Sequence, residues 1–568
     1  MTADNGMKPA GATLPSSAYA PETGTRTSRA EFNLTAAFYR QSVLQPHAAA
    51  LHVAGARLSY FELASLARRV SGWLSCPASG SAKIGILASR SIEAYAGILG
   101  ALWSGAAYVP INPKTPEERL IHILGITQLD ALIVDAAGAD RLSERVLEHA
   151  PRCILCGAVS PTLLESAKQA DVTVENFFHL PEGKPEEPVP VSEDALAYII
   201  FTSGTTGVPK GVMIETGSVI QMIEIMQRRF GFRTDDRMSG ASELTFDASV
   251  FGMFMTWSAG ASLHVVPESQ LMAPGRFIRD NELTIWNSAP SIALFMQRIG
   301  MLMPGAFPLL RYSLFGGETL PLALARAWQA AAPNSHVENL YGPTEATVQC
   351  TAQRLTDPPN VTANRDALAI GLPFEGVEAD VFDSTLNPVV GSDPGELVLS
   401  GRQLSRGYFN DLQMTAARFP VLRGKRWYRT GDLVYRDESG AFHHLGRIDN
   451  QVKVLGNRVE LEEVEAHLRA ITRTDLVVAI AWPVINDRAS GMVAFICNSQ
   501  VGVNAALEAM RTRVPGYMIP RQIREIKTMP LGSSGKIDRK ALFRALEEEK
   551  DSISSNVSLG SHENHTAD

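Results

Sequence analysis

A run of small and hydroxyl-bearing residues at 202–207 is the first candidate for chemistry in this sequence. It comprises Thr202, Ser203, Gly204, Thr205, Thr206 and Gly207, and Lys210 follows three positions later. Glycines let backbone N–H groups approach an anion closely, hydroxyls add donors, and a lysine supplies positive charge. The run therefore predicts a phosphate-binding loop. Because Lys210 is followed by Gly211 and no helix clearly begins there, the pattern disfavours a P-loop nucleotide hydrolase.

The elements that must position this loop follow an alternating pattern from about residue 31 to 445. Short apolar runs at Lys83–Leu87, Ala131–Val134 and Tyr198–Phe201 predict strands, with helical patterns between them. This alternation indicates α/β layers with largely parallel sheets. The lone CxxC at Cys153–Cys156 has no second cysteine pair, so a buried strand is favoured over a zinc site.

Two later regions differ from this pattern. Short strands with turn signals near residues 385–445 predict a small β subdomain, and residues 450–545 read as compact α+β with an amphipathic helix at Leu461–Ile471. The uncharged stretches Ala94–Val109 and Ser249–Val266 are short or polar for a membrane span, so each is expected to be a buried helix followed by a strand.

Several motifs in one order resemble the acyl-adenylate-forming superfamily, and in particular a freestanding adenylation domain of nonribosomal peptide synthesis. The resemblance begins with the twelve residues 201–212 and covers about residues 35–545. It is carried further by Leu58–Leu63, Leu102–Asn112, Gly395–Leu397 and Ser405–Phe409. It implies an enzyme that uses ATP to convert a carboxylic acid into an acyl-adenylate.

The resemblance assigns the nucleotide to three further motifs. In Asn339–Glu345, Asn339 would bind the adenine edge, Tyr341 would stack on the purine, Thr344 would contact the α-phosphate and Glu345 would hold Mg²⁺. Asp432 would accept hydrogen bonds from the ribose hydroxyls, and Arg447 would contact the ribose or a phosphate.

Two other residues take mechanistic roles by the same resemblance. Asp449 matches the hinge about which a small C-terminal domain rotates between two half-reactions. Lys536 directly follows the loop Gly532–Gly535 and would contact the substrate carboxylate and the α-phosphate during an in-line displacement.

The acid is expected to be an amino acid. Asp247 occupies the position that pairs with a substrate ammonium in amino-acid-activating relatives, although it also stands where it would cap a helix starting at Ala248. The other expected pocket residues are Ala248, Phe251, Asn287, Leu314, Gly316, Leu340, Val348 and Gln349. With no second charge among them, a neutral substrate of modest size fits best. Asn287 and Gln349 would bind a polar substrate group or pair with each other, and a β-amino acid stays open.

Composition sets the remaining expectations. The 568 residues carry a net charge of −8 and five cysteines, which argues against a nucleic-acid binder and against a disulfide framework. The first residues lack the apolar core of a secretory signal, so a cytoplasmic protein that does not enter a membrane is expected. The expected division is a disordered leader at 1–30, a large N-terminal domain of two α/β sheet subdomains plus a β subdomain at 31–448, a small mobile α+β domain at 449–545, and a disordered tail at 546–568.

The fate of the adenylate is an expectation of the same kind. Only 32 residues follow Lys536, too few for a carrier domain of roughly 80 residues. The predicted partner is therefore a separate carrier protein, whose phosphopantetheine thiol accepts the acyl group. Two alternatives stay open: a CoA ligase for a small carboxylic acid, which would not need Asp247, and a catalytically silent adenylation-like binding protein.

Overall fold

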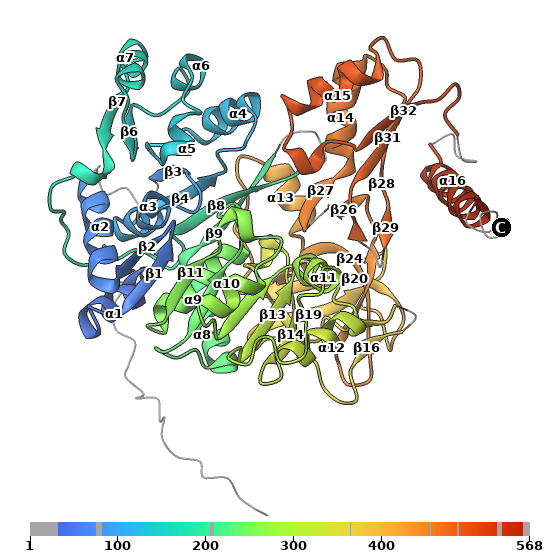
Figure 1. The fold of residues 1–568 in the computed structure, drawn as a ribbon, viewed down its shortest axis with the longest axis horizontal. Coiled ribbons are helices and arrows are strands. Elements are labelled where there is room, and N and C mark those ends of the chain that lie inside the picture. The colour runs from blue at the N-terminus through green and yellow to red at the C-terminus, as the bar shows by residue number, and fades with distance from the viewer. Residues whose placement is uncertain are drawn as a thin grey trace, which may run out of the picture.

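The computed structural model describes residues 32–560 except 75–81, 205–208, 364, 455, 486–487 and 531–536, with side chains described to residue 550 except those of Ile485 and Arg488. Two large sheets, a smaller antiparallel sheet and a C-terminal α+β region follow one another along the chain (Figure 1). This is the predicted mixed α/β architecture. Among the described residues, no helix combines the length and the apolar character that crossing a membrane requires.

The first large sheet has eight strands in the order β21-β9-β8-β4-β3-β5-β6-β7. Its central strands are parallel, whereas β9 and β21 are antiparallel to their neighbours. The predicted strands at 83–87, 131–134, 153–156 and 198–201 are confirmed as β3, β5, β6 and part of β8. The strands are β3 (Lys83–Leu87), β4 (Ala107–Ile111), β5 (Ala131–Val134), β6 (Cys153–Cys156), β7 (Thr173–Asn176), β8 (Leu196–Thr202), β9 (Lys210–Glu215) and β21 (Gly407–Tyr408).

The second large sheet has nine strands in the order β18-β15-β14-β13-β12-β10-β11-β1-β2. Strands β1, β11, β10, β12, β13 and β14 are parallel, whereas β2 at one end of the sheet and β15 and β18 at the other are antiparallel to their neighbours. The strands are β1 (Ala49–Val53), β2 (Ala56–Ser59), β10 (Arg237–Gly240), β11 (Ser262–Val265), β12 (Ile285–Ser288), β13 (Tyr312–Gly316), β14 (His336–Tyr341), β15 (Thr351–Arg354) and β18 (Leu372–Pro373).

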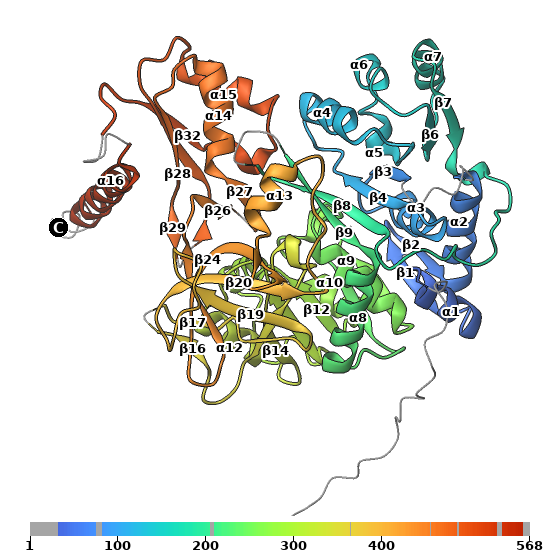
Figure 2. The same cartoon turned by 180° about the vertical axis from the view of Figure 1, so that it is seen from behind.

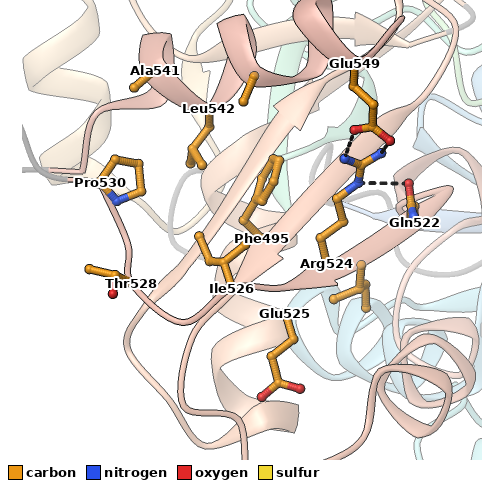
Figure 3. A pocket seen from close by; sticks show the side chains of 12 residues that line it. Phe495, Gln522, Arg524, Glu525, Ile526, Thr528, Pro530, Ala541, Leu542 and Glu549 are labelled. Carbon is orange, nitrogen blue, oxygen red and sulfur yellow. Dashed lines mark hydrogen bonds and ion pairs between the residues drawn. The ribbon is translucent and has the colours of Figure 1, made fainter. Parts of the chain in front are cut away.

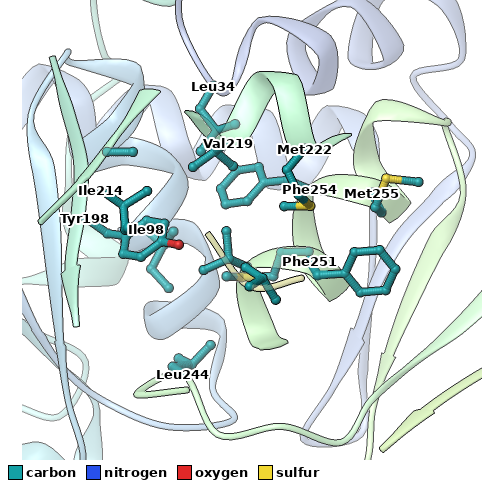
Figure 4. Packing of buried hydrophobic residues seen from close by; sticks show 14 of the residues in the cluster. Leu34, Ile98, Tyr198, Ile214, Val219, Met222, Leu244, Phe251, Phe254 and Met255 are labelled. Carbon is teal, nitrogen blue, oxygen red and sulfur yellow. The ribbon is translucent and has the colours of Figure 1, made fainter. Parts of the chain in front are cut away.

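One hydrophobic core joins the two large sheets. It contains residues of α3 (Ile92–Trp103), α8 (Thr216–Phe230) and α9 (Ala248–Ser258), together with strand residues of both sheets. Helix α9 is apolar on almost every side, as expected for a helix buried all round. Figure 4 shows Phe251 and Phe254 of α9 among Ile98 of α3 and Val219 and Met222 of α8. The expected helix-then-strand units at 94–109 and 249–266 are therefore confirmed.

The other helices of the first 450 residues cover the outer faces or connect the sheets (Figure 1). They are α1 (Ala36–Leu44), α2 (Tyr60–Trp73), α4 (Glu117–Thr127), α5 (Ala136–Ala139), α6 (Glu144–Leu147), α7 (Pro161–Gln169), α10 (Gly275–Asp280), α11 (Pro290–Arg298), α12 (Leu322–Ala331) and α13 (Leu412–Arg418).

The predicted β subdomain is a four-stranded antiparallel sheet in the order β19-β20-β24-β25. Its strands are β19 (Val377–Phe382), β20 (Gly395–Gly401), β24 (Tyr428–Arg436) and β25 (Phe442–Arg447). Two short pairs accompany it: β16 (Val361–Thr362) with β17 (Ala367–Leu368), and β22 (Val421–Leu422) with β23 (Lys425–Arg426).

The C-terminal region has its own core and lies beside the first sheet in both views (Figures 1 and 2). The predicted amphipathic helix is confirmed as α14 (Leu461–Thr472), whose Val464, Leu468 and Ile471 are buried. The other elements are β26 (Gln451–Val454), β27 (Asn457–Glu460), β28 (Val477–Ala481), β29 (Val484–Ile485), β30 (Arg488–Ala489), β31 (Met492–Ile496), α15 (Val503–Arg511), β32 (Gln522–Glu525) and α16 (Arg539–Gly560).

Helix α16 continues to Gly560, into the segment that was expected to be a disordered tail. The run Arg539–Lys550 is rich in alanine, leucine, glutamate, lysine and arginine, which are strong helix formers. Its Leu542 and Leu546 are buried against β28 and β31, so tertiary packing anchors the first half of the helix.

Candidate functional site

The predicted phosphate-binding loop connects two antiparallel strands. Thr202 at the end of β8 pairs with Lys210 at the start of β9, so the loop is the turn of a hairpin and does not open a helix. This agrees with the expectation that the loop is not a Walker motif. Of the predicted loop residues, Thr205, Thr206 and Gly207 lie outside the described residues.

The described part of the loop is held by residues of the C-terminal region. Ser203 Oγ donates to the carbonyl oxygen of Arg458 at 2.9 Å and accepts from the backbone N–H of Glu460 at 3.1 Å. The Gly204 N–H donates to Glu463 Oε2 at 2.9 Å. These bonds attach the start of α14 and the end of β27 directly to the loop.

Lys210 is buried and paired. Its Nζ lies 3.0 Å from Glu460 Oε1, and Gln451 Nε2 donates to the same oxygen. Burial and the neighbouring Arg458 lower the pKa of Lys210, whereas Glu460 and Glu345 act in the opposite direction. The lysine therefore lies in a dense group of alternating charges.

Glu345 lies at the centre of this group, in the 3₁₀ turn η3 (Thr344–Ala346), and is fully buried. Its Oε1 accepts from the Tyr408 hydroxyl at 2.8 Å and its Oε2 from Arg458 Nη1 at 2.8 Å. Burial alone would raise the pKa of Glu345, but Arg458 and Lys210 hold it at about 2. Glu345 is thus an ionised carboxylate at neutral pH, of the kind that a hard cation prefers.

Asp432 on β24 is the second buried carboxylate, and three side chains donate to it. Tyr341 Oη lies 2.5 Å from Oδ2, while Arg447 Nη1 and His444 Nε2 lie 2.9 and 3.2 Å from Oδ1. Burial opposes its ionisation, but Arg447 and His444 hold the pKa of Asp432 well below its ordinary value. Strand register explains the contact with His444. This histidine pairs with Val434, which lies two residues after Asp432 and on the same face of the sheet.

Asn339 is predicted to bind the adenine edge, Asp449 to act as the hinge and Lys536 to act in catalysis. Asn339 is buried on β14, and its side-chain amide donates to the Ala369 carbonyl oxygen at 2.8 Å. Asp449, between β25 and β26, accepts two hydrogen bonds from Arg447, at 2.9 and 2.7 Å. Lys536 lies outside the described residues.

Asp247 precedes the first residue of α9, but its side chain does not make the hydrogen bond of a helix cap. The hydroxyl of Thr344, the residue before Glu345, and the backbone N–H of Ala248 both act on it as hydrogen-bond donors and lower its pKa. Burial, reinforced by Glu345, raises the pKa of Asp247 to about 6. This carboxylate therefore lies at the start of α9 and next to Thr344 and Glu345.

Strand register brings the expected pocket residues to one face of the second sheet. Asn287 of β12 pairs with Leu314 of β13, and Gly316 pairs with Leu340 of β14. Paired residues, and residues two apart, point to the same side of a sheet. That side faces α9, because Leu314 and Leu340 share a core with Phe251, whereas Trp286 and Phe315 pack in the core on the other face. Ala248 and Phe251 come from α9, and Val348 and Gln349 come from the turn after η3.

The best-defined cavity lies away from these residues. It measures about 830 Å³ and lies between β32 and α16 in the C-terminal region, with Phe495, Ile526 and Leu542 among its lining residues (Figure 3). Its charged groups Arg524 and Glu549 form an ion pair with each other. None of the predicted site residues lines it, so the candidate site is the charged group around Glu345 and the adjoining pocket.

Comparison with known proteins gives one consistent answer. A family model described as AMP-binding enzyme matches residues 38–409. Syringomycin synthase SyrB1 of Pseudomonas syringae pv. syringae is 31% identical over 518 residues, which cover 88% of this chain and 79% of that protein. Tyrocidine synthase 3 of Brevibacillus parabrevis is 30% identical over 518 residues, which cover 90% of this chain but only 8% of that much longer protein.

Solved structures agree with the sequence relatives. The Vibrio cholerae adenylation domain AlmE, in complex with glycyl-adenosine-5′-phosphate, superposes with a TM-score of 0.82 at 30% identity, covering 92% of this chain and 99% of that one. A holo protein containing nonribosomal peptide synthetase adenylation and PCP domains, bound to a vinylsulfonamide inhibitor, gives a TM-score of 0.72 at 25% identity, covering 90% and 84%.

Proposed function

The chain belongs to the AMP-binding enzymes, within the adenylate-forming adenylation domains, and on this premise we propose that it activates an amino acid. The amino acid and ATP would give aminoacyl-AMP and pyrophosphate. The aminoacyl group would then pass to the phosphopantetheine thiol of a separate carrier protein. The cytoplasm, where ATP is available, would be its place.

The observation that carries the choice of an amino acid is the position of Asp247. Burial raises the pKa of Asp247. Its ionised form therefore needs a cationic partner to offset the free-energy cost of desolvation. Its hydrogen bond with Thr344 places it beside the residue that would contact the α-phosphate. An α- or β-ammonium bound at Asp247 would hold the substrate carboxylate near that phosphate.

The first half-reaction would be a displacement at phosphorus. A carboxylate oxygen of the amino acid attacks the α-phosphorus, a new P–O bond forms, and the bond to the bridging oxygen breaks with release of pyrophosphate. Thr344 and Lys536 would supply hydrogen-bond donors and positive charge where the two anions meet. In the second half-reaction a deprotonated thiol attacks the carbonyl carbon and AMP leaves.

The nucleotide would lie between Asp432 and the phosphate-binding loop. Asp432 would accept the ribose hydroxyls, Tyr341 would stack on the adenine with Asn339 at its edge, and Arg447 would contact the ribose or a phosphate. A carboxylate offers about four lone-pair sites. Tyr341, Arg447 and His444 already donate to Asp432, so two ribose hydroxyls require at least one of these donors to leave.

Glu345 fits the role of magnesium ligand by its chemistry, since it is ionised and carries hard oxygen atoms. Bound there, Mg²⁺ would neutralise phosphate charge. Arg458 donates to one carboxylate oxygen and Tyr408 to the other. Arg458 would have to withdraw before Mg²⁺ binds Glu345, because the positive charges of the guanidinium and the cation repel each other.

That requirement gives a role to Asp449. The residues that fill the loop, Arg458, Glu460 and Glu463, all follow Asp449 in the chain. A rotation about Asp449 would remove them together and open the loop to ATP. Few residues are needed to absorb such a rotation.

The direct test is identification of the product. The protein would be incubated with ATP, Mg²⁺ and a mixture of amino acids and small carboxylic acids without an amino group, with and without coenzyme A, and analysed by mass spectrometry. We expect an aminoacyl-AMP with stoichiometric pyrophosphate, and its loss in Lys536→Ala with nucleotide binding retained. An acyl-CoA from an acid without an amino group would identify a CoA ligase, and nucleotide binding without any product would identify a silent homologue.

A further inference from the structure

From the lining of the pocket we infer that the substrate side chain is neutral and donates a hydrogen bond, as a hydroxyl or a carboxamide does. Gln349 and Asn287 are the residues that would recognise it. The inference rests on the proposed function, because the pocket is the one that begins at Asp247.

The side-chain oxygen of Gln349 is buried and, within the described ranges, unpaired. The residue is 5% exposed, and its Oε1 is buried without a hydrogen-bond partner among the described residues. An unpaired buried acceptor is uncommon in native proteins and costs free energy. A donor carried by the substrate would remove that cost.

Asn287 supplies a second amide, on the face of the second sheet that carries Leu314. The residue is 6% exposed, and its backbone N–H is bonded to Ser239 Oγ at 2.9 Å. In the part of the chain that the structure describes, no hydrogen bond engages its side chain, and none joins it to Gln349. The two amides therefore do not form a hydrogen bond with each other, although the sequence had left that pairing open.

The turn that presents Gln349 is strained. Thr347 and Val348 have φ values of 55° and 71°, in the left-handed region that β-branched residues avoid. The Gln349 N–H donates to the Thr347 carbonyl oxygen at 2.9 Å, which closes a γ-turn around Val348. Strain of this kind persists only where the surroundings impose it, and it concentrates at functional sites.

Two neighbours impose this turn. Gln403 Nε2 donates to the Gln349 carbonyl oxygen at 2.9 Å, and Thr347 Oγ1 donates to the Gln403 carbonyl oxygen at 2.5 Å. Gly342 allows the close approach, because a Cβ there would lie 2.5 Å from the Val348 carbonyl oxygen. These contacts fix the backbone of Gln349, four residues after Glu345.

The rest of the lining limits the substrate. Apart from Asp247, no charged side chain stands among the pocket positions, so a charged substrate side chain would be buried without a partner. Phe251, Leu314, Leu340 and Val348 form the apolar walls. A purely apolar side chain would suit these walls but would leave the Gln349 oxygen unpaired. A substrate side chain of modest size that ends in a hydroxyl or carboxamide can pack against these walls and also donate a hydrogen bond to the Gln349 oxygen.

The test compares near-isosteric amino acids by ATP–pyrophosphate exchange. The pairs are threonine and valine, serine and alanine, asparagine and leucine, and glutamine and methionine. For the best pair we expect kcat/KM to favour the donor-bearing member by about 10- to 100-fold. Gln349→Leu should reduce this preference to about one, while Gln297→Leu, an exposed substitution of the same kind on α11, should leave it unchanged.

Asn287→Leu provides an independent variant should Gln349→Leu fail to fold, and it should also weaken the preference. Wild-type preference for the apolar members would overturn the inference and leave the proposed function standing. A donor preference that survives both Gln349→Leu and Asn287→Leu would overturn the role of these two residues. Absence of exchange with every amino acid would overturn the proposed function itself.

Discussion

Glu460 Oε1 lies 3.0 Å from Lys210 Nζ, so the lysine of the phosphate-binding loop is paired with a carboxylate that lies 250 positions later in the chain. The pair is buried on both sides. Arg458 makes the matching contact with Glu345. Two charges of opposite sign from one short segment therefore neutralise the two charges that would meet the nucleotide.

Removal of the Glu460 charge should favour ATP. In Glu460→Gln the competing anion is lost while the shape of the side chain is kept, so we expect the KM for ATP in the exchange reaction to fall about 2- to 10-fold. Glu508→Gln, a surface substitution of the same kind on α15, should leave this KM unchanged. A higher KM in Glu460→Gln would show that the pair supports ATP binding.

We expect Tyr341 to bind ATP through its aromatic ring and not through its hydroxyl. Its hydroxyl donates to Asp432, and that bond competes with a ribose hydroxyl. We expect Tyr341→Phe to keep the KM for ATP within a factor of about three, and Tyr341→Ala to raise it roughly 5- to 150-fold, the range of base–aromatic stacking. Equal losses in both variants, measured by initial rates, would assign the role to the hydroxyl.

Asp247 should reduce stability while it serves binding. Its pKa is raised from 3.8 to about 6 in the folded protein, so ionisation costs stability as the pH rises through this window, and the cost is complete above about pH 6. Asp247→Asn should therefore stabilise the ligand-free protein by roughly 1–3 kcal/mol at pH 7.5 and by little at pH 4. Thermal unfolding at the two pH values measures this, and equal Tm changes at both would contradict the burial of the charge.

The same carboxyl group should set a pH dependence. Because only the carboxylate attracts an ammonium, the KM for the amino acid should rise up to about tenfold per pH unit below about pH 6. The control is the KM of Asp247→Asn for the same amino acid, because this variant has no carboxyl group to titrate at that position. A parallel rise in both constants would assign the titration to another group.

Most site residues could be predicted because they lie in short motifs whose spacing is local. Asp247 directly precedes α9, and Thr344 and Glu345 lie in the 3₁₀ turn that follows β14, so three positions named from local motifs lie close together, while their roles stay predictions. His444 required the register of the β24–β25 hairpin, which the turn residues alone do not set.

The contacts of Arg458, Glu460 and Glu463 were not predicted, because they depend on how the C-terminal region docks on the loop. Nothing in the local pattern encodes that orientation. The strained turn at Thr347 and Val348 was also missed, since β-branched residues ordinarily predict extended backbone there. Only the surrounding contacts with Gln403 and Gly342 account for it.

The central claim is that the substrate carries an ammonium held by Asp247. The most direct measurement is ATP–pyrophosphate exchange with amino acids and with the matching acids that lack the amino group, for example alanine with propionate. We predict exchange with an amino acid, at least about 100-fold weaker exchange with its des-amino partner, and loss of this discrimination in Asp247→Ala. Equal or stronger exchange with the acid that lacks an amino group would contradict the claim.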